Sequence, residues 1–158
     1  MKRDYPDRPI VGVGAVIVEN GCALLVRRGT EPLKGEWSIP GGVVELGETL
    51  REAAAREAQE ETGLQVEAGE VLEVVDRIMR DPESKVQYHY VLVDFLCRRV
   101  SGEAQAAADA SELRWITIKE LQGFPIADSA AGVIRKGFER AALESKTAHS
   151  SSESVGRR

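Results

Sequence analysis

Residues 42–64 read GVVELGETLREAAAREAQEETGL, and this stretch decides the fold that we expect for the chain. Thr49, followed three residues later by Glu52, matches a capping box, in which the two side chains satisfy free N–H groups at a helix start. The interior is rich in alanine, glutamate and arginine, which favour helix, and Gly63 is typical of a helix end. The stretch therefore predicts a helix over residues 49–62.

Three glutamates gather near the end of this predicted helix. Glu57 and Glu61 lie one turn apart with Glu60 beside them, so all three fall within roughly 100° of arc. Like charges at this spacing cost about 0.2–0.5 kcal/mol per pair, and the helix dipole disfavours anions at this end. An ordinary solvated helix face is one interpretation, with Arg56 and Glu60 as an i,i+4 pair. The other is a site for Mg²⁺ or Mn²⁺, because hard cations prefer carboxylate oxygens and in turn hold phosphates.

The segments on both sides of this helix predict strands. Residues 10–18 are rich in β-branched side chains, Asn20-Gly21 is typical of a two-residue hairpin turn, and residues 22–27 supply the returning strand. A short strand at 37–39 is expected to stop at Pro40, because proline cannot donate to a ladder. The later pattern predicts strands at 66–79, 86–100 and 113–116, and helices at 117–121 and 127–143. This order predicts an α/β fold, a sandwich with a curved mixed sheet between helices.

Length and composition fit one domain. A chain of 158 residues with 42% hydrophobic and 30% charged residues can bury a single core. We expect a polar, loose lead-in over residues 1–9, the domain over residues 10–144, and a disordered serine-rich tail over residues 145–158. No run is long and apolar enough to cross a membrane, and the N-terminus lacks the apolar stretch of a secretion signal. The sequence therefore predicts a cytoplasmic protein with no membrane partner.

Charge and cysteine content exclude further classes of function. The 26 acidic and 21 basic residues give a net charge of −5, which repels duplex nucleic acid where no basic patch is evident. Phosphates can still bind an acidic protein when a divalent cation lies between them. Cys22 and Cys97 each stand alone in an apolar stretch, which is typical of buried free thiols rather than of a disulfide or a zinc site.

Residues 42–64 resemble the signature of the Nudix hydrolase family: glycine, five residues, glutamate, seven residues, Arg-Glu, an aliphatic residue, one residue, Glu-Glu, one residue, glycine and an aliphatic residue. Seven fixed positions would agree by chance about 10⁻⁸ of the time per starting point. The resemblance covers about residues 9–143 and extends to the Trp37–Gly42 entry and the late strand at 112–115. The agreeing positions are Gly42, Glu48, Arg56, Glu57, Glu60, Glu61 and Gly63, while Ala58 is small for its aliphatic position.

The resemblance implies the Nudix fold and hydrolysis of a nucleoside diphosphate linked to another group. It implies that Glu57, Glu60 and Glu61 are metal ligands or, for one of them, the general base, and that the Gly42 carbonyl joins the coordination shell. It further implies that Arg56 and Glu48 orient these ligands through a salt bridge. Which glutamate is the base stays open. Carboxylates of a late loop often complete such a site, and Asp109 and Glu112 are the candidates, although Glu112 also fits as an ordinary acid at the start of a strand.

Other residues have both a functional and an ordinary interpretation. Arg27 and Arg28 end a strand, where they either bind a substrate phosphate or face solvent. Lys34 is a weaker phosphate candidate. Trp37 is a candidate for stacking on a nucleobase, as are Tyr88, Tyr90 and Trp115, although aromatic residues in strands are more often core. His89 is more readily understood as a packed histidine than as a catalytic one.

Two substrates are compatible with the resemblance. The segment from Arg77 to Phe95 is similar to bacterial relatives that act on ADP-ribose, so ADP-ribose or a nucleotide sugar is our first hypothesis. The alternative is a MutT-like pyrophosphohydrolase of (d)NTPs. An inactive nucleotide-binding module is a remote third hypothesis, because every acid of the signature is present. A homodimer is compatible with the long predicted strands.

Overall fold

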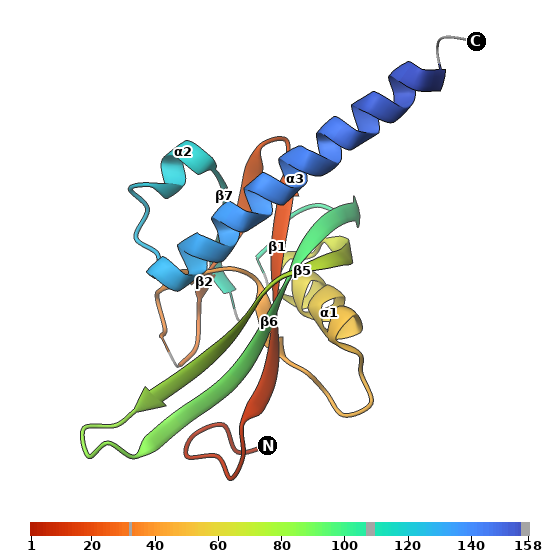
Figure 1. The fold of residues 1–158 in the computed structure, drawn as a ribbon. Helices are drawn as coiled ribbons and strands as arrows, with labels where there is room; N and C mark the ends of the chain where they lie inside the picture. Colours follow the sequence, from red (N-terminus) through yellow and green to blue (C-terminus); the bar gives the residue numbers. More distant parts are fainter. Residues whose placement is uncertain (32, 107–109, 156–158) are drawn as a thin grey trace.

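The protein is described by a computed structural model over residues 1–31, 33–106 and 110–155. Its strands are β1 (Ile10–Glu19), β2 (Cys22–Arg28), β3 (Trp37–Ser38), β4 (Gly41–Val43), β5 (Gln65–Arg80), β6 (Val86–Ser101) and β7 (Ala110–Thr117). Its helices are α1 (Leu50–Thr62), α2 (Ile118–Leu121) and α3 (Asp128–Val155). In Figure 1, α1 and α3 lie on opposite sides of the sheet, so the predicted layering of helices around a mixed sheet is confirmed.

The sheet has seven strands in the order β3-β2-β1-β6-β5, with β4 paired to β1 and β7 paired to β2. The pairing of β1 with β6 is parallel over residues 10–17 and 90–97, and the other pairings between these strands are antiparallel. The β1–β2 hairpin turns at Asn20 and Gly21, whose φ angles of 51° and 74° are those of the predicted turn. The long β5–β6 hairpin leaves β5 at the sheet edge.

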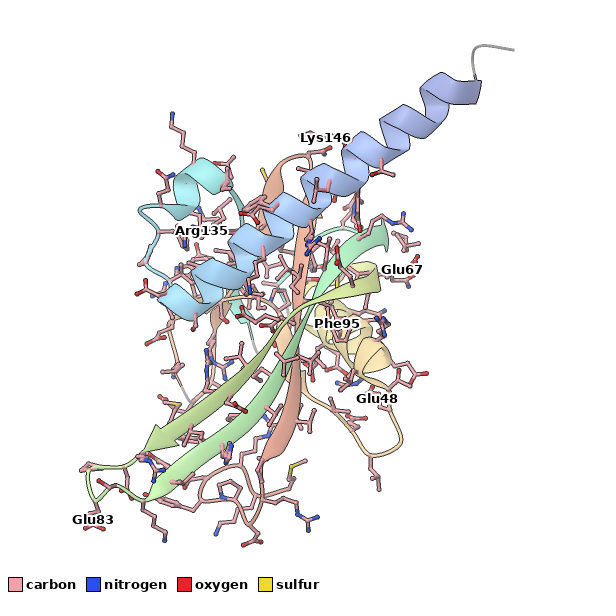
Figure 2. The ribbon with its side chains drawn as sticks, in the orientation of Figure 1. Glu48, Glu67, Glu83, Phe95, Arg135 and Lys146 are labelled. Carbon is pink, nitrogen blue, oxygen red and sulfur yellow. The ribbon has the colours of Figure 1, made fainter. Side chains whose placement is uncertain are left out.

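The two sides of the sheet carry two hydrophobic cores, because side chains alternate between faces along a strand. On one side, residues of β1 and β6 pack with three alanines of α1, and Phe95 lies between the strands and that helix (Figure 2). Ala53, Ala54 and Ala58 have no exposed surface, so α1 lies close against the sheet. The second core joins β2, β7, α2 and α3, with buried members Ala23, Leu25, Ile116, Leu121, Ala131, Ile134 and Phe138.

Three features differ from the sequence-based expectations. The segment Gly41–Val43, expected to end a strand, forms β4 and pairs with residues 12–14 of β1. Residues 145–155, expected to be disordered, continue α3 as helix beyond the sheet, while 156–158 lie outside the described residues (Figure 1). The N-terminal segment is not loose, because the Tyr5 hydroxyl donates to Asp81 at 2.7 Å and the Tyr5 N–H donates to the Gln87 carbonyl at 2.8 Å.

No helix in the described part of the chain is both long and apolar enough to cross a bilayer.

Candidate active site

The acidic helix starts and ends where the sequence predicts. Thr49 caps α1: its hydroxyl accepts from the Glu52 N–H at 3.2 Å, and its own N–H donates to the Glu52 carboxylate at 2.8 Å. Gly63 ends the helix with a φ of 76°, in the left-handed region. The helix therefore has fixed ends, and its glutamates project from a rigid element.

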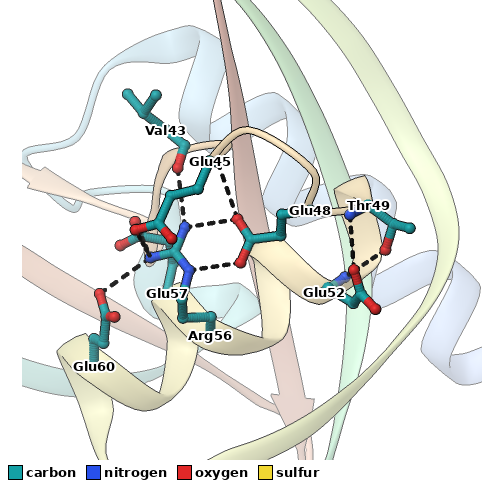
Figure 3. Close-up of polar contacts among 8 residues, drawn as sticks. All are labelled: Val43, Glu45, Glu48, Thr49, Glu52, Arg56, Glu57 and Glu60. Carbon is teal, nitrogen blue, oxygen red and sulfur yellow. Dashed lines mark hydrogen bonds and ion pairs between the residues drawn. The ribbon is translucent and has the colours of Figure 1, made fainter. Parts of the chain in front are cut away.

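Arg56 lies at the centre of the glutamates (Figure 3). Its guanidinium donates to both carboxylate oxygens of Glu48, at 2.7 and 2.9 Å, which is the bidentate geometry in which such pairs are strongest. It also donates to Glu57 at 2.9 Å, to Glu60 at 3.2 Å and to the carbonyl of Val43 at 3.0 Å. The salt bridge that the resemblance implies between Arg56 and Glu48 is therefore present in the structure.

The charges of this group perturb one another. The bidentate hydrogen bond from Arg56 lowers the pKa of Glu48 to about 2, and the same bond raises the pKa of Arg56 above its ordinary value. Glu57 behaves differently: burial raises its pKa, although the hydrogen bond from Arg56 acts against the shift. Only 15% of the Glu57 side chain is exposed, against 58% for Glu60. Glu57 is thus the more buried of these two carboxylates, and a positive charge beside it would offset the cost of that burial.

The backbone of strand β4 lies against the carboxylates of Glu57 and Glu61. The Gly41 N–H donates to the Glu61 carboxylate at 3.0 Å. Gly42 lies so close to Glu57 that a Cβ at this position would collide with the Glu57 carboxylate. A residue with a side chain at position 42 would therefore displace Glu57, which gives a physical reason for glycine there.

Two adjoining cavities lie beside this group. The larger, of about 520 Å³, is the glutamate cavity, and its lining includes Gly42, Arg56, Glu57, Glu60 and Glu61. The smaller, of about 140 Å³, is the inner cavity, between β1, β5, β6 and the start of α3. Six residues line both cavities: Arg3, Arg28, Ile39, Gly41, Gly42 and Val43. The two cavities are therefore neighbouring parts of one depression.

The chemistry of the donors suits a hard divalent ion. Carboxylate and carbonyl oxygens are the ligands that Mg²⁺ and Mn²⁺ prefer, and Glu57, Glu60 and Glu61 share one cavity with Gly42. Within the described residues, no group of three or more acidic, histidine or cysteine side chains is already gathered around one point. Glu57 and Glu60 instead share the Arg56 guanidinium, which donates a hydrogen bond to each of them.

Of the other predicted site residues, some line the glutamate cavity and others lie outside both cavities. Arg27 and Arg28 line the glutamate cavity. Glu112 pairs with Arg27 at 3.7 Å and lines neither cavity. Trp37 packs edge-on against Phe124, with 5.4 Å between ring centroids, and also lines neither cavity. Asp109 lies outside the described residues. Their roles in the reaction stay predictions.

Sequence reasoning missed two residues of this depression. Arg3 belongs to the segment expected to be loose, yet it lines both cavities and acts electrostatically on Glu57. Asp94 lies in the inner cavity with 7% of its surface exposed. The available signal for Asp94 was its position as the one Asp, Glu, Lys or Arg in the otherwise uncharged run of residues 86–97. No comparable signal marked Arg3.

Comparison with known proteins identifies relatives along most of the chain. A family model described as NUDIX domain matches residues 8–137. An ADP-ribose pyrophosphatase of Methanocaldococcus jannaschii is 36% identical over 113 residues, 72% of this chain and 64% of that protein. A putative 8-oxo-dGTP diphosphatase 2 of Mycobacterium tuberculosis is 39% identical over 114 residues, 71% of this chain and 75% of that protein. This chain therefore spans less than two thirds of the first relative's length.

A solved structure shares the architecture. The MutT NUDIX hydrolase from Burkholderia pseudomallei superposes with a TM-score of 0.69 at 29% identity, covering 82% of this chain and 98% of that one. The expected sandwich of helices around a curved mixed sheet is the fold of that protein as well.

Proposed function

The chain belongs to the Nudix family, and on this basis we propose that it is a divalent-metal-dependent pyrophosphohydrolase that cleaves the diphosphate linkage of a nucleoside diphosphate derivative. The observation that carries the proposal is the group of glutamates around Arg56 at the wall of the glutamate cavity. Nudix hydrolases generally need divalent metal ions. Mg²⁺ or Mn²⁺ is our choice, because both prefer all-oxygen ligands.

Glu57, Glu60, Glu61 and the Gly42 carbonyl would hold the ion, which when bound neutralises the diphosphate charge and polarises the P–O bond under attack. Arg56 acts through the glutamates rather than on the substrate, because its hydrogen bonds fix Glu48 and orient Glu57. Glu48 in turn holds the guanidinium in place, and its carboxylate also accepts a hydrogen bond from the Glu45 N–H at 3.1 Å.

The reaction is a displacement by water at phosphorus. The water oxygen bonds to one phosphorus, the bond from that phosphorus to the bridging oxygen breaks, and the bridging oxygen leaves with the other phosphoryl group. The proton of the attacking water passes to one of the three α1 carboxylates, and Glu57 and Glu61 are the two that the structure holds by short hydrogen bonds. Arg27 and Arg28 line the same cavity and supply positive charge for the phosphate oxygens.

ADP-ribose or a nucleotide sugar is the first candidate substrate. The support is the relative from M. jannaschii, named as an ADP-ribose pyrophosphatase. A (d)NTP pyrophosphohydrolase activity of the MutT type is the second candidate, and it is favoured by the higher coverage of the relative named as a putative 8-oxo-dGTP diphosphatase 2. Both candidates use the same acidic helix and differ in the group that fills the rest of the depression.

A substrate panel tests the proposal. The full chain is incubated with Mg²⁺ or Mn²⁺ and with ADP-ribose, sugar nucleotides, dinucleoside polyphosphates or (d)NTPs, and the products are identified by chromatography. We expect ADP-ribose to give AMP and ribose 5-phosphate, with no turnover when the metal is chelated. Turnover of NTPs with inert ADP-ribose would establish the second candidate. A chain that hydrolyses none of them would refute the proposed function.

A further inference from the structure

Asp94 is a buried acid that the proposed reaction does not use. Leu92 and Tyr90, two and four residues earlier on the same strand, line the inner cavity with it, whereas Val93 and Phe95 belong to the core under α1. Side chains alternate between the faces of a sheet, so the Asp94 side chain lies on the face covered by α3, away from the acidic helix. The cavity, and not the hydrophobic core, therefore surrounds its carboxylate.

The Asp94 carboxylate has no partner in the described part of the chain. It makes no hydrogen bond or ion pair there, and the charged groups that act on it are Glu73 and Arg77 of β5. Glu73 pairs with Lys136 of α3 at 3.2 Å. No fully enclosed polar side-chain atom lacks a hydrogen-bond partner in these residues, so the Asp94 oxygens must reach open space in the cavity. A buried carboxylate without a protein partner is costly, so a ligand that donates hydrogen bonds to these oxygens would gain affinity from them.

The floor of the cavity is shaped around this carboxylate. A Cβ at Gly14, the residue beside Asp94 on β1, would collide with the Asp94 carboxylate, and a Cβ at Gly12 would lie 2.8 Å from the Leu92 side chain. The other walls are mixed: Val75 and Met79 from β5 and Val133 from α3 are apolar, and Arg77 from β5 lines the same cavity. Apolar walls with a few placed polar groups are the usual form of a small-molecule site.

The size and position of the cavity fit a nucleobase. Its volume of about 140 Å³ is close to that of a dry protein cavity of about 150 Å³ that accepts benzene. The cavity adjoins the glutamate cavity, and two cations, Arg3 and Arg28, line both. A base in the inner cavity would thus leave its phosphates beside positive charge and within the same depression as the glutamates.

We propose that Asp94 is a specificity-determining residue that accepts hydrogen bonds from the amino group of a purine held in the inner cavity. An ionised carboxylate has acceptors only, so it can bond the exocyclic –NH₂ of adenine, or the N1–H and –NH₂ of guanine together, but it repels a bare carbonyl at the same place. The inference rests on the proposed function in taking the ligand to be a nucleotide. It adds the class of base that the site selects.

Binding of matched nucleotide pairs tests the inference without turnover. The metal-free full chain is titrated calorimetrically at pH 7.5 with GMP against IMP, which lacks the 2-amino group, and with AMP against purine riboside 5′-monophosphate, which lacks the 6-amino group. We expect the amino-bearing member of at least one pair to bind about tenfold or more tightly, the discrimination typical of a good hydrogen-bonded base contact. Equal affinities within both pairs, or no binding of any of the four, would overturn the inference.

Two variants assign any preference to Asp94. In Asp94→Leu an apolar side chain of similar size removes the acceptor, so the preference should fall toward unity. In Asp94→Asn one amide oxygen still accepts while the –NH₂ repels a second donor, so the preference should fall but not vanish. Asp76→Asn, an exposed acid on β5, is the matched control and should keep the full preference. An undiminished preference in either folded variant would refute the role of Asp94.

The outcome is separable from that of the proposed function. Hydrolysis with metal in the substrate panel, together with equal affinities in the nucleotide pairs, would leave the reaction standing and remove the base-recognition role. An amino-group preference in a chain that hydrolyses nothing would support the base-recognition role and refute the proposed reaction.

Discussion

The burial of Asp94 should make the protein less stable at neutral pH than an Asp94→Asn variant. Burial raises the pKa of Asp94 from its ordinary value of 3.8 to about 6, with a contribution from the nearby Glu73. The shift is roughly two units at about 1.4 kcal/mol each, so holding the ionised group in place costs about 3 kcal/mol. That is a large share of the roughly 5–15 kcal/mol that stabilises a typical domain.

The sign of the pH dependence follows from the direction of this pKa shift. Between pH 3.8 and about 6 the native state holds the proton more tightly than the unfolded chain, so the free energy of unfolding falls as pH rises. Above about pH 6 the full cost is present, and below about pH 4 it is absent. Asparagine is neutral throughout, so the variant should be more stable by up to about 3 kcal/mol at pH 7.5 and should lose this advantage near pH 4. The unpaired amide N–H groups reduce the gain.

Urea denaturation of both proteins at several pH values, followed by circular dichroism, measures this difference. Asp76→Asn is again the control, and an exposed change of this kind should shift stability by less than about 0.5 kcal/mol at every pH. A difference between Asp94→Asn and the parent that stays flat from pH 4 to 7.5 would refute the reasoning, because it would mean that Asp94 titrates alike in the folded and unfolded chains.

Three further changes test other parts of the structure. Glu61→Gln should fold normally and lose orders of magnitude in kcat. Its control is Glu67→Gln, which changes an exposed acid on β5 and should leave kcat unchanged in the same assay. An active Glu61→Gln protein would contradict the role proposed for the glutamates. Thr49→Ala removes one half of the capping box and should lower the free energy of unfolding by about 1 kcal/mol in urea titrations, and an unchanged midpoint would show that α1 does not depend on its cap. Tyr5→Phe removes the hydrogen bond to Asp81 that holds the N-terminal segment beside the cavities. The KM for the anionic substrate should therefore rise by less than about tenfold, with kcat nearly constant. A fall in kcat at constant KM would argue against this account.

The features that the sequence predicted correctly have local causes. Asn20 and Gly21 form their turn because both tolerate positive φ, and Thr49 and Gly63 cap α1 through neighbours within a few residues. The ion pair of Arg56 with Glu60 is likewise set by the helical repeat. Such contacts can be inferred because the chain segment that makes them is continuous.

The features that were missed depend on distant partners. Strand β4 consists of Gly41, Gly42 and Val43, and glycine indicates a break rather than a strand. The strand exists because it pairs with residues 12–14 of β1. The two backbones lie so close that a Cβ at Gly41 would collide with the Val13 carbonyl, which explains why glycine stands there. The site of Asp94 depends in the same way on which strand lies beside β6 and which helix covers it, and no local pattern contains that information.

The position of Arg56 among the acids also has a consequence for how the protein matures. Arg56 already balances part of the negative charge of Glu48, Glu57 and Glu60, so we expect the polypeptide to fold before it acquires the proposed ion. Binding of the proposed ion would then be a late, reversible step on a chain that is already folded. Removing the proposed ion with a chelator should accordingly abolish hydrolysis while the chain still melts cooperatively, at a temperature lowered only by the lost binding free energy of the ion, and adding the ion back should restore activity.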